Sequence, residues 1–178
     1  AKPEKKQQNI NKKNYHLIAN EKEIDEWINE AEETGELAID TETSSLDAHQ
    51  ADLVGISLST MIGKACYIPI GHKFKGCLKK EAVIKKLKPL LEDKSVKKIG
   101  QNIKFDFIVL FKQGINMNSM EDTMLMSYVL DAGKNRHNMD TLSEIHLQHK
   151  TISFKEIVGT GKKEINFSDV ELDKAMEY

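Results

Sequence analysis

Three short apolar runs in the first half of the chain constrain its fold more than any other feature. The runs cover residues 37–40, 53–59 and 65–70, and polar, turn-rich segments separate them. Runs of this length and composition are typical of buried strands. Residues 62–64 form a connection of hairpin length between the last two runs, and strands joined in this way pair antiparallel. We therefore expect a three-stranded antiparallel meander.

Helical patterns surround this meander. Asn20 followed by Glu23 is typical of a capping box, so we expect the first helix to begin there and to end near Gly35. The order of strands and helices along the chain predicts an α/β fold, in which helices pack over a mixed sheet. The other expected elements are short strands over residues 15–19 and 97–100 and helices over residues 79–92, 104–113, 123–130 and 139–149 and from Ser168 to the end of the chain.

The chain has 178 residues, enough for one well-packed domain and too few for two ordinary ones. Hydrophobic residues make up 39% and charged residues 30%, a balance that excludes an intrinsically disordered chain. Residues 1–14 are polar, lysine-rich and aperiodic, so we interpret them as an interdomain linker, with a basic arm that grips DNA as the alternative. The folded domain is then expected over residues 15–178.

Charge and cysteine content narrow the class of protein. The formal net charge of −2 excludes a broad basic face, so any contact with DNA must be local. Cys66 and Cys77 fit no metal motif and indicate free thiols in a reducing cytoplasm. No apolar run is long enough to span a membrane, and no signal peptide is visible. Because the chain lacks an initial methionine and stops inside a helical pattern, we expect it to be a fragment of a longer protein.

Two carboxylates follow the first apolar run. Asp40 and Glu42 are two positions apart, and side chains at this spacing on a strand point to the same face. Adjacent negative charges repel each other unless a cation neutralises them, and hard oxygen ligands suit Mg²⁺ or Mn²⁺. A solvated turn is the alternative, because an Asp-x-Glu pattern is common by chance.

A second polar group follows the strand expected over residues 97–100. Asn102 and Asp106 are four positions apart and are expected on one face of the next helix, with a helix cap as the alternative for Asn102. Asp106 stands among apolar neighbours, where a carboxylate needs a partner. That partner is either a metal ion or a lysine. Four histidines lack zinc-site spacing and are interpreted as surface or core residues: His72, His137, His146 and His149.

Together with the residues at the end of the chain, these two polar groups form a recognisable series of sequence motifs. Residues 38–47 resemble the first exonuclease motif of the proofreading domain of bacterial DNA polymerase I, and residues 101–106 resemble the second. Residues 136–142 and 149–154 are similar to the segment between the second and third motifs, and residues 172–178 to the opening of the third. Each motif alone is weak, but all of them occur in order and at the family's spacing.

The resemblance implies a ribonuclease-H-like fold, with the meander extended by parallel strands, in the tyrosine subtype of the DEDD exonuclease superfamily. It also implies hydrolysis of the 3′-terminal phosphodiester of single-stranded or frayed DNA, with release of nucleoside 5′-monophosphates. The implied partners are a single-stranded DNA 3′ end and the polymerase domain of the parent chain. A monomer without membrane association is expected.

The resemblance further implies two Mg²⁺ or Mn²⁺ ions. Asp40 would bridge both ions, Glu42 would hold the ion beside the attacking water, and Asp106 would hold the other ion through water. Tyr178 would orient the attacking water with its hydroxyl. In this subtype the fourth catalytic aspartate lies four residues after the tyrosine, just past the end of this chain. The fragment's metal site is therefore expected to lack one ligand, and the fragment to cut slowly or not at all.

Further residues are candidates for substrate binding by the same resemblance. Leu46 and Phe154 match the apolar residues that sandwich the terminal bases, and stacking of this kind tolerates any base. Core packing is the alternative for both. Lys104 is a candidate for a phosphate contact. Three polar residues are candidates for hydrogen bonds to the terminal sugar or phosphate: Thr43, Gln101 and Asn102.

Two other functions remain open. The first is a non-catalytic DNA-binding scaffold, which would bind DNA without metal; the presence of Asp40, Glu42 and Asp106 argues against it. The second is a stand-alone RNA-processing exonuclease of the same superfamily. The linker-like start and the match between the second and third motifs disfavour this reading.

Overall fold

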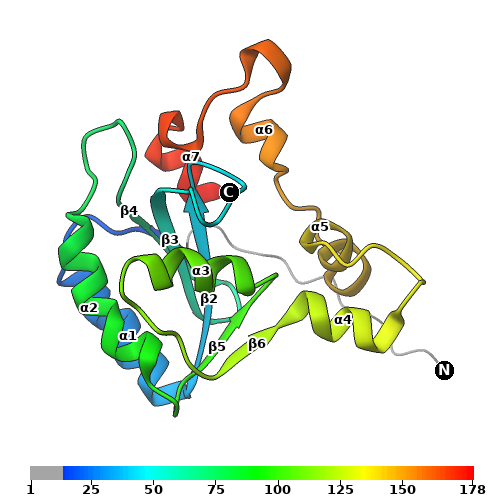
Figure 1. Ribbon diagram of the computed structural model, residues 1–178, viewed down its shortest axis with the longest axis horizontal. Helices are drawn as coiled ribbons and strands as arrows, with labels where there is room; N and C mark the ends of the chain where they lie inside the picture. Colours follow the sequence, from blue (N-terminus) through cyan, green and yellow to red (C-terminus); the bar gives the residue numbers. More distant parts are fainter. Residues whose placement is uncertain (1–13) are drawn as a thin grey trace.

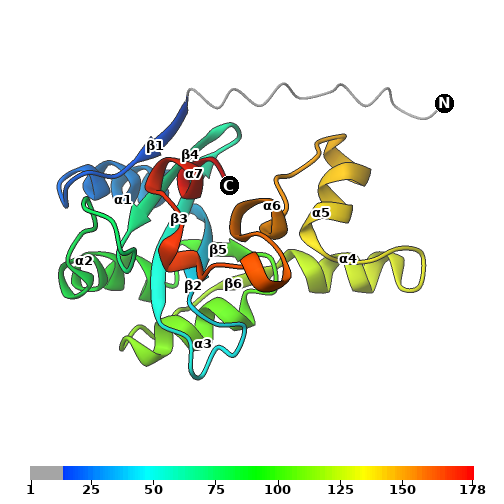
Figure 2. The same cartoon turned by 90° about the horizontal axis from the view of Figure 1, so that it is seen from above.

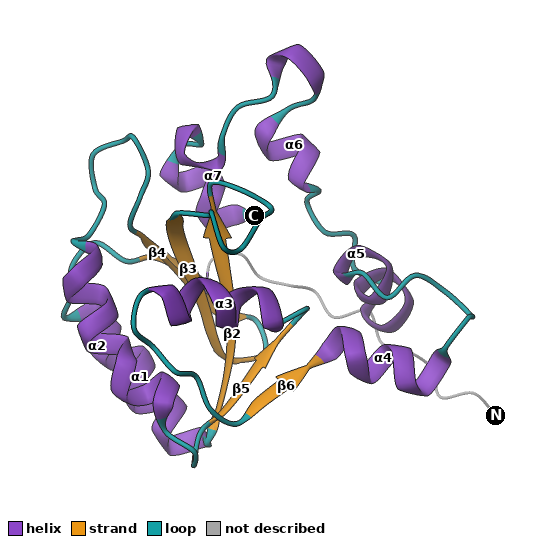
Figure 3. Cartoon of the chain, viewed as in Figure 1, coloured by secondary structure: helices purple, strands orange, loops and turns teal. Residues whose placement is uncertain are grey.

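The sheet has the meander at its centre and parallel strands on both sides. The computed structural model describes residues 14–178, so the predicted linker lies outside the described residues except for Asn14. The strand order is β1-β4-β3-β2-β5-β6. Figure 3 labels all of these strands except β1, which is labelled in Figure 2. The strands β2, β3 and β4 pair antiparallel, whereas β1 pairs parallel with β4, and β5 with both β2 and β6. The strand bounds are β1 Tyr15–Leu17, β2 Glu36–Thr43, β3 Leu53–Met61, β4 Lys64–Pro69, β5 Lys97–Gly100 and β6 Met120–Asp122. The expected mixed sheet is confirmed.

Helices lie over both faces of this sheet. The helices α1, α2 and α3 cover one face, and α6 and α7 lie on the other side (Figures 1 and 2). The helices α4 and α5 continue beyond β6 (Figure 1). The helix bounds are α1 Glu23–Thr34, α2 Lys80–Glu92, α3 Lys104–Lys112, α4 Thr123–Asp131, α5 Met139–Leu142, α6 Phe154–Val158 and α7 Leu172–Glu177, with a π turn at Ser143–Leu147 and 3₁₀ turns at Gly161–Lys163 and Phe167–Asp169. No helix formed by residues 14–178 has the length and apolar character needed to cross a bilayer.

The alternation of side chains along β2 separates the main core from the functional face. Leu37, Ile39 and Thr41 are buried, whereas the residues between them are partly exposed. Leu37 and Ile39 join the main core, which includes Trp27 of α1 and Leu87 of α2. Because side chains alternate along a strand, Asp40 and Glu42 point to the opposite face. A smaller core of Tyr67, Phe167, Val170 and neighbouring residues lies on that second face.

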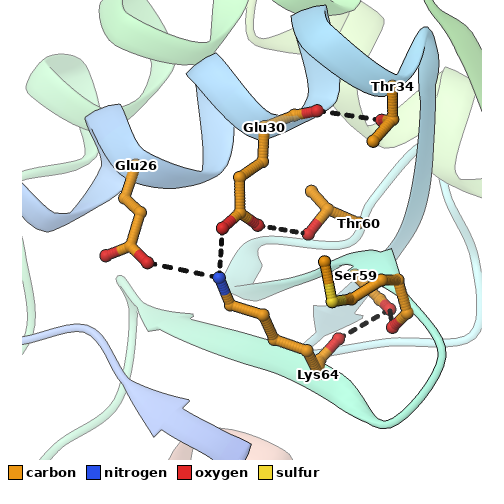
Figure 4. Close-up of polar contacts among 7 residues, drawn as sticks. Glu26, Glu30, Thr34, Ser59, Thr60 and Lys64 are labelled. Carbon is orange, nitrogen blue, oxygen red and sulfur yellow. Dashed lines mark hydrogen bonds and ion pairs between the residues drawn. The ribbon is translucent and has the colours of Figure 1, made fainter.

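A charged anchor holds the hairpin between β3 and β4 against α1. Lys64 forms ion pairs with Glu30 and with Glu26, the latter at 3.2 Å, and lies 4.8 Å from the ring centroid of Trp27. Thr60 donates a hydrogen bond of 2.6 Å to Glu30 (Figure 4). These contacts fix the meander against the helix that precedes it, and so fix the strand that carries Asp40.

The first helix begins later than the sequence pattern predicts. Glu23 is the first residue of α1, and Lys22 takes the cap position. Asn20 accepts a hydrogen bond from the backbone of Lys22 (3.1 Å), and Glu23 accepts one from the backbone of Ala19 (2.9 Å). The two capping residues therefore stabilise the turn before the helix. Gly35 ends α1 as expected, in the left-handed region at φ 71°.

Two later helices also differ from the prediction. The expected helix from Ser168 is wrong: residues 167–169 form a 3₁₀ turn capped by Asn166, the backbone is extended at Val170, and α7 begins at Leu172. The helix expected over residues 139–149 is α-helical only as far as Leu142 and then widens into a π turn. The strand β6 and the helix α6 were not predicted, since three- and five-residue elements show little periodicity. Cys66 is buried and Cys77 half-buried, both as free thiols, as expected.

Candidate active site

The carboxylates of Asp40 and Glu42 lie on the open face of the sheet. In the strand register, Asp40 is opposite Ser57, which in turn is opposite Tyr67, and Glu42 is opposite Gly55. A β-bulge follows between Glu42 and Thr43. Bulges re-aim side chains at the ends of strands, and this one marks the point where β2 leaves the sheet.

Asp106 reaches the same strand from α3. Its side chain is only 2% exposed, and Oδ1 accepts hydrogen bonds from the backbone N–H of Thr41 (2.8 Å) and from its hydroxyl (2.6 Å). The parallel partner β5 pairs only with residues 36–38 of β2. Asp106 therefore takes a backbone donor that β5 does not reach, and it is held next to the Asp40–Glu42 pair.

Burial and mutual repulsion dominate the electrostatics of these three groups. Burial, and then the charge of Asp106, raises the pKa of Asp40 to about 7. Burial and the charges of Asp40 and Asp106 raise the pKa of Glu42 to about 8. Burial raises the pKa of Asp106 to about 6, although its bonds with Thr41 oppose the rise. Among the described residues, no basic side chain contributes to these shifts, so the acidic group lacks a protein cation.

The donor set fits a hard divalent cation, since clustered carboxylates without a basic partner are the usual ligands of Mg²⁺ or Mn²⁺. Within residues 14–178, however, no three Asp, Glu, His or Cys side chains are arranged so that they could hold a metal ion. In this arrangement the three carboxylates are not by themselves placed as a metal site.

Tyr178 lies near the carboxylates within an aromatic cluster. Burial and the nearby charges of Glu42 and Asp40 raise the pKa of its hydroxyl, which keeps the phenol protonated. Its ring contacts Phe167 and Phe154, with centroids 5.9 and 6.3 Å away. The structure therefore brings the predicted tyrosine to the predicted acidic pair.

The structure places Asn102 differently from the prediction. Asn102 lies before α3 and is exposed, in the left-handed region at φ 59°, so it neither caps the helix nor shares a helical face with Asp106. Its backbone N–H donates to Asp122 Oδ1 (3.0 Å). Asparagine tolerates this backbone conformation better than most residues, which explains its position in the tight turn. Gln101 bridges its surroundings, accepting from Thr123 (2.6 Å) and donating to the carbonyl of His137 (2.7 Å).

The other predicted substrate residues are spread around the site. Leu46 is 92% exposed on the loop after β2, and Phe154 is 41% exposed and stacks on Phe167 with an interplanar angle of 9°. Thr43 donates to the carbonyl of Ser45 (2.9 Å). Leu46 is therefore not a core residue, whereas Phe154 is only partly packed.

Two hollows adjoin these residues. One of about 720 Å³ lies between the sheet and the α4–α5 region, and Asp40, Ser57 and Gln101 line it. Lys104 lines a different hollow with Phe107 and Leu125. The face beside Asp40 is thus open, and the structure does not bring Lys104 to it.

Sequence reasoning missed four residues that organise the site. Thr41 fixes Asp106, and Asp122 caps α4 while it holds Asn102. Tyr67 and His72 form a buried hydrogen bond of 2.6 Å. The burial of Thr41 was readable from strand alternation, but the pairings over long sequence separations were not. His72, for which a surface and a core position were both open, is buried.

Comparison with known proteins gives concordant results. A family model described as 3′-5′ exonuclease matches residues 15–178. DNA polymerase I of Rhizobium leguminosarum is 44% identical over 176 residues, which cover 87% of this chain and 17% of that protein. The chain spans about a fifth of the length of the curated relatives it matches.

Solved structures agree on the fold. The EXO domain of Aedes aegypti Nibbler superposes with a TM-score of 0.68 at 11% identity, over 96% of this chain and 84% of that one. Brucella melitensis NrnC with bound Mg²⁺ gives 0.58 at 24% identity, over 91% and 78% of the two chains. At these identities the structural similarity establishes the fold alone.

Proposed function

The chain belongs to the 3′-5′ exonuclease family, as the exonuclease domain of a DNA polymerase I, and we propose that it trims single-stranded or frayed 3′ ends of DNA with the help of divalent metal ions. The observation that carries this proposal is the group of three carboxylates, Asp40, Glu42 and Asp106, held together without a basic partner among the described residues. A cluster of this kind has little use in a structural domain, because it costs stability unless a cation is bound.

We propose Mg²⁺ or Mn²⁺ as the cation, with two ions in the complete site. Ions of this class stabilise the attacking and leaving oxygens of an in-line phosphoryl displacement. Asp40 and Glu42 would hold them from β2, and Asp106 from α3. The bond from Thr41 keeps Asp106 Oδ1 in a fixed position, so the orientation of this carboxylate is set before the metal binds. The fourth carboxylate would follow Tyr178 in the parent polypeptide.

Tyr178 would position the attacking water. Its phenol is protonated near neutral pH, and burial and the adjacent carboxylates raise its pKa further. A protonated hydroxyl can donate one hydrogen bond and accept another, which is what orientation of a water molecule requires. The water then attacks the terminal phosphorus, the 3′ oxygen leaves, and the product is a nucleoside 5′-monophosphate.

The substrate strand would approach along the open face. Leu46 offers an exposed apolar side chain and Phe154 a half-exposed ring, both suited to stacking on bases without sequence preference. Thr43, Gln101 and Asn102 remain proposed contacts to the sugar and phosphate at this face. Lys104, which lines a different hollow, remains a proposed phosphate contact away from it. Proofreading beside a polymerase domain of the same polypeptide, a monomeric state and a cytoplasmic location belong to this proposal.

A nuclease assay tests the proposal. A polypeptide that extends past Tyr178 by its natural sequence is incubated with 3′-labelled single-stranded DNA or RNA and Mg²⁺. We expect release of nucleoside 5′-monophosphates from DNA, and loss of this release in Asp40→Ala. Undiminished activity in that variant would contradict the proposal. Metal-independent DNA binding without hydrolysis would favour a scaffold, and faster cleavage of RNA would favour an RNA-processing enzyme.

A further inference from the structure

A buried histidine connects the segment before α7 to the central sheet. His72 Nδ1 lies 2.9 Å from the carbonyl oxygen of Val170, and Nε2 lies 2.6 Å from the hydroxyl of Tyr67. A carbonyl oxygen only accepts, so Nδ1 must carry the proton and donate. In the neutral imidazole Nε2 is then an acceptor, and the Tyr67 hydroxyl donates to it. Each polar atom in this series of hydrogen bonds is therefore assigned as either a donor or an acceptor.

One end of this chain of contacts lies beside the acidic pair. Gly55 is directly opposite Glu42 in the sheet. A Cβ atom placed on Gly55 would lie 2.0 Å from the Tyr67 hydroxyl oxygen. The phenol therefore occupies the space that a side chain would fill on the strand next to Glu42. Tyr67 thus links His72 to the part of the sheet where β2 carries Asp40 and Glu42.

The other end leads to Tyr178. Val170 is two residues before α7, the helix that Tyr178 follows directly. The Phe167 ring contacts both His72 and Tyr178, with centroids 5.8 and 5.9 Å away. Lys73 strengthens the same junction, donating from its backbone to the carbonyl of Ser168 (2.9 Å). Both ends of the segment before α7 are therefore tied to the loop that contains His72.

We propose that His72, together with Tyr67, is a positioning residue for the exonuclease reaction: it fixes the segment before α7 so that the Tyr178 hydroxyl lies over Asp40 and Glu42. This inference rests on the proposed function. It assigns no chemical step to His72, whose ring nitrogens contact Tyr67 and Val170. A displacement of the catalytic tyrosine of about 1 Å is enough to lower turnover substantially, by about a hundredfold.

Conservative variants test this role. Tyr67→Phe keeps the ring and removes only the hydroxyl. In His72→Asn the amide nitrogen replaces Nδ1, which preserves the bond to Val170, whereas His72→Gln places an acceptor near the position of Nε2 and loses that bond. In the polypeptide extended past Tyr178, we expect kcat on single-stranded DNA to fall roughly ten- to a hundredfold in His72→Gln and less in His72→Asn, with KM unchanged.

Two further measurements separate positioning from general stability. Tyr178→Phe combined with His72→Gln should lower kcat no more than Tyr178→Phe alone, because both changes act through one hydroxyl. Hydrogen exchange at the amides of Ala175 and Tyr178 should accelerate in His72→Gln in this chain itself. Tyr128→Phe, on the exposed face of α4, is the matched control and should change neither quantity.

The outcomes distinguish the two proposals. If Asp40→Ala abolishes hydrolysis while Tyr67→Phe and both His72 variants keep wild-type kcat, the positioning role is overturned and the proposed function stands. Additive effects of His72→Gln and Tyr178→Phe would also overturn it. If Asp40→Ala retains activity, the proposed function fails, and unchanged exchange at Tyr178 would then overturn the structural coupling independently.

Discussion

Asp106 Oδ1 accepts two hydrogen bonds from Thr41, one from the backbone at 2.8 Å and one from the hydroxyl at 2.6 Å, across 65 positions of sequence. The bonds join the helix that follows β5 to the strand that carries the other two carboxylates. They lower the pKa of Asp106 against the effect of burial. A single threonine between two acidic residues thus orients the third.

Thr41→Val should weaken both the fold and the metal site. It removes the hydroxyl donor from a buried carboxylate, which costs about 1–3 kcal/mol of unfolding free energy. Mn²⁺ affinity should fall by about 10- to 100-fold, because an orienting partner of a ligand is lost. Urea unfolding and Mn²⁺ titration measure the two effects. Thr60→Val, which removes a hydroxyl from Glu30 far from the site, should leave Mn²⁺ affinity unchanged.

Gly55→Ala should destabilise the domain by overpacking. The new methyl group would meet the Tyr67 ring and hydroxyl, with the nearest atom at 2.0 Å. Overpacking of a buried site costs about 1–3 kcal/mol, which thermal or urea unfolding would detect. Gly71→Ala is unsuitable as a control because it also meets backbone, at 2.7 Å. Met61→Ala, whose side chain is exposed at the end of the same strand, is the better one. A loss of stability at Gly55 no larger than at Met61 would contradict the packing described.

The metal-free chain should lose stability as pH rises from about 4 to about 8. Asp40 and Glu42 have folded-state pKa values of about 7 and 8, above their ordinary 3.8 and 4.5. Between these limits the folded state binds more protons than the unfolded state, so the unfolding free energy decreases with pH. Denaturation with a chelator present should show a flatter slope for Asp40→Asn/Glu42→Gln. An identical slope in that variant would indicate that these carboxyls are not the groups involved.

Leu46→Ala should weaken binding of single-stranded DNA and leave stability unchanged, because the side chain is 92% exposed. Loss of an apolar leucine contact with a base corresponds to at most about 1.5–3 kcal/mol of binding free energy. Phe154→Ala should lower both quantities, since its ring also packs on Phe167. Fluorescence anisotropy with a labelled oligonucleotide measures the binding. Ile62→Ala, which removes another highly exposed apolar side chain on the β3–β4 hairpin (85% exposed), is the control and should bind normally.

Patterns among residues that are close in sequence account for most of the structural features that were correctly predicted. Strand alternation placed Asp40 and Glu42 on one face, and apolar runs located the meander, because both depend on neighbours along the chain. The position of Asn102 was not predictable in this way, since it depends on Asp122, which caps the next helix from 20 residues away. The start of α7 failed for a similar reason. Ser168 has the composition of a cap, but His72 and Lys73 bind the backbone around it and hold Val170 extended.

The most direct test of the carboxylate site is a crystal structure of the polypeptide extended past Tyr178 by its natural sequence, soaked with Mn²⁺ and measured with anomalous scattering. We expect an anomalous peak in contact with the carboxylates of Asp40 and Glu42, and no peak there in Asp40→Ala. A wild-type structure without Mn²⁺ at these residues, or a peak that persists unchanged in the variant, would contradict this expectation.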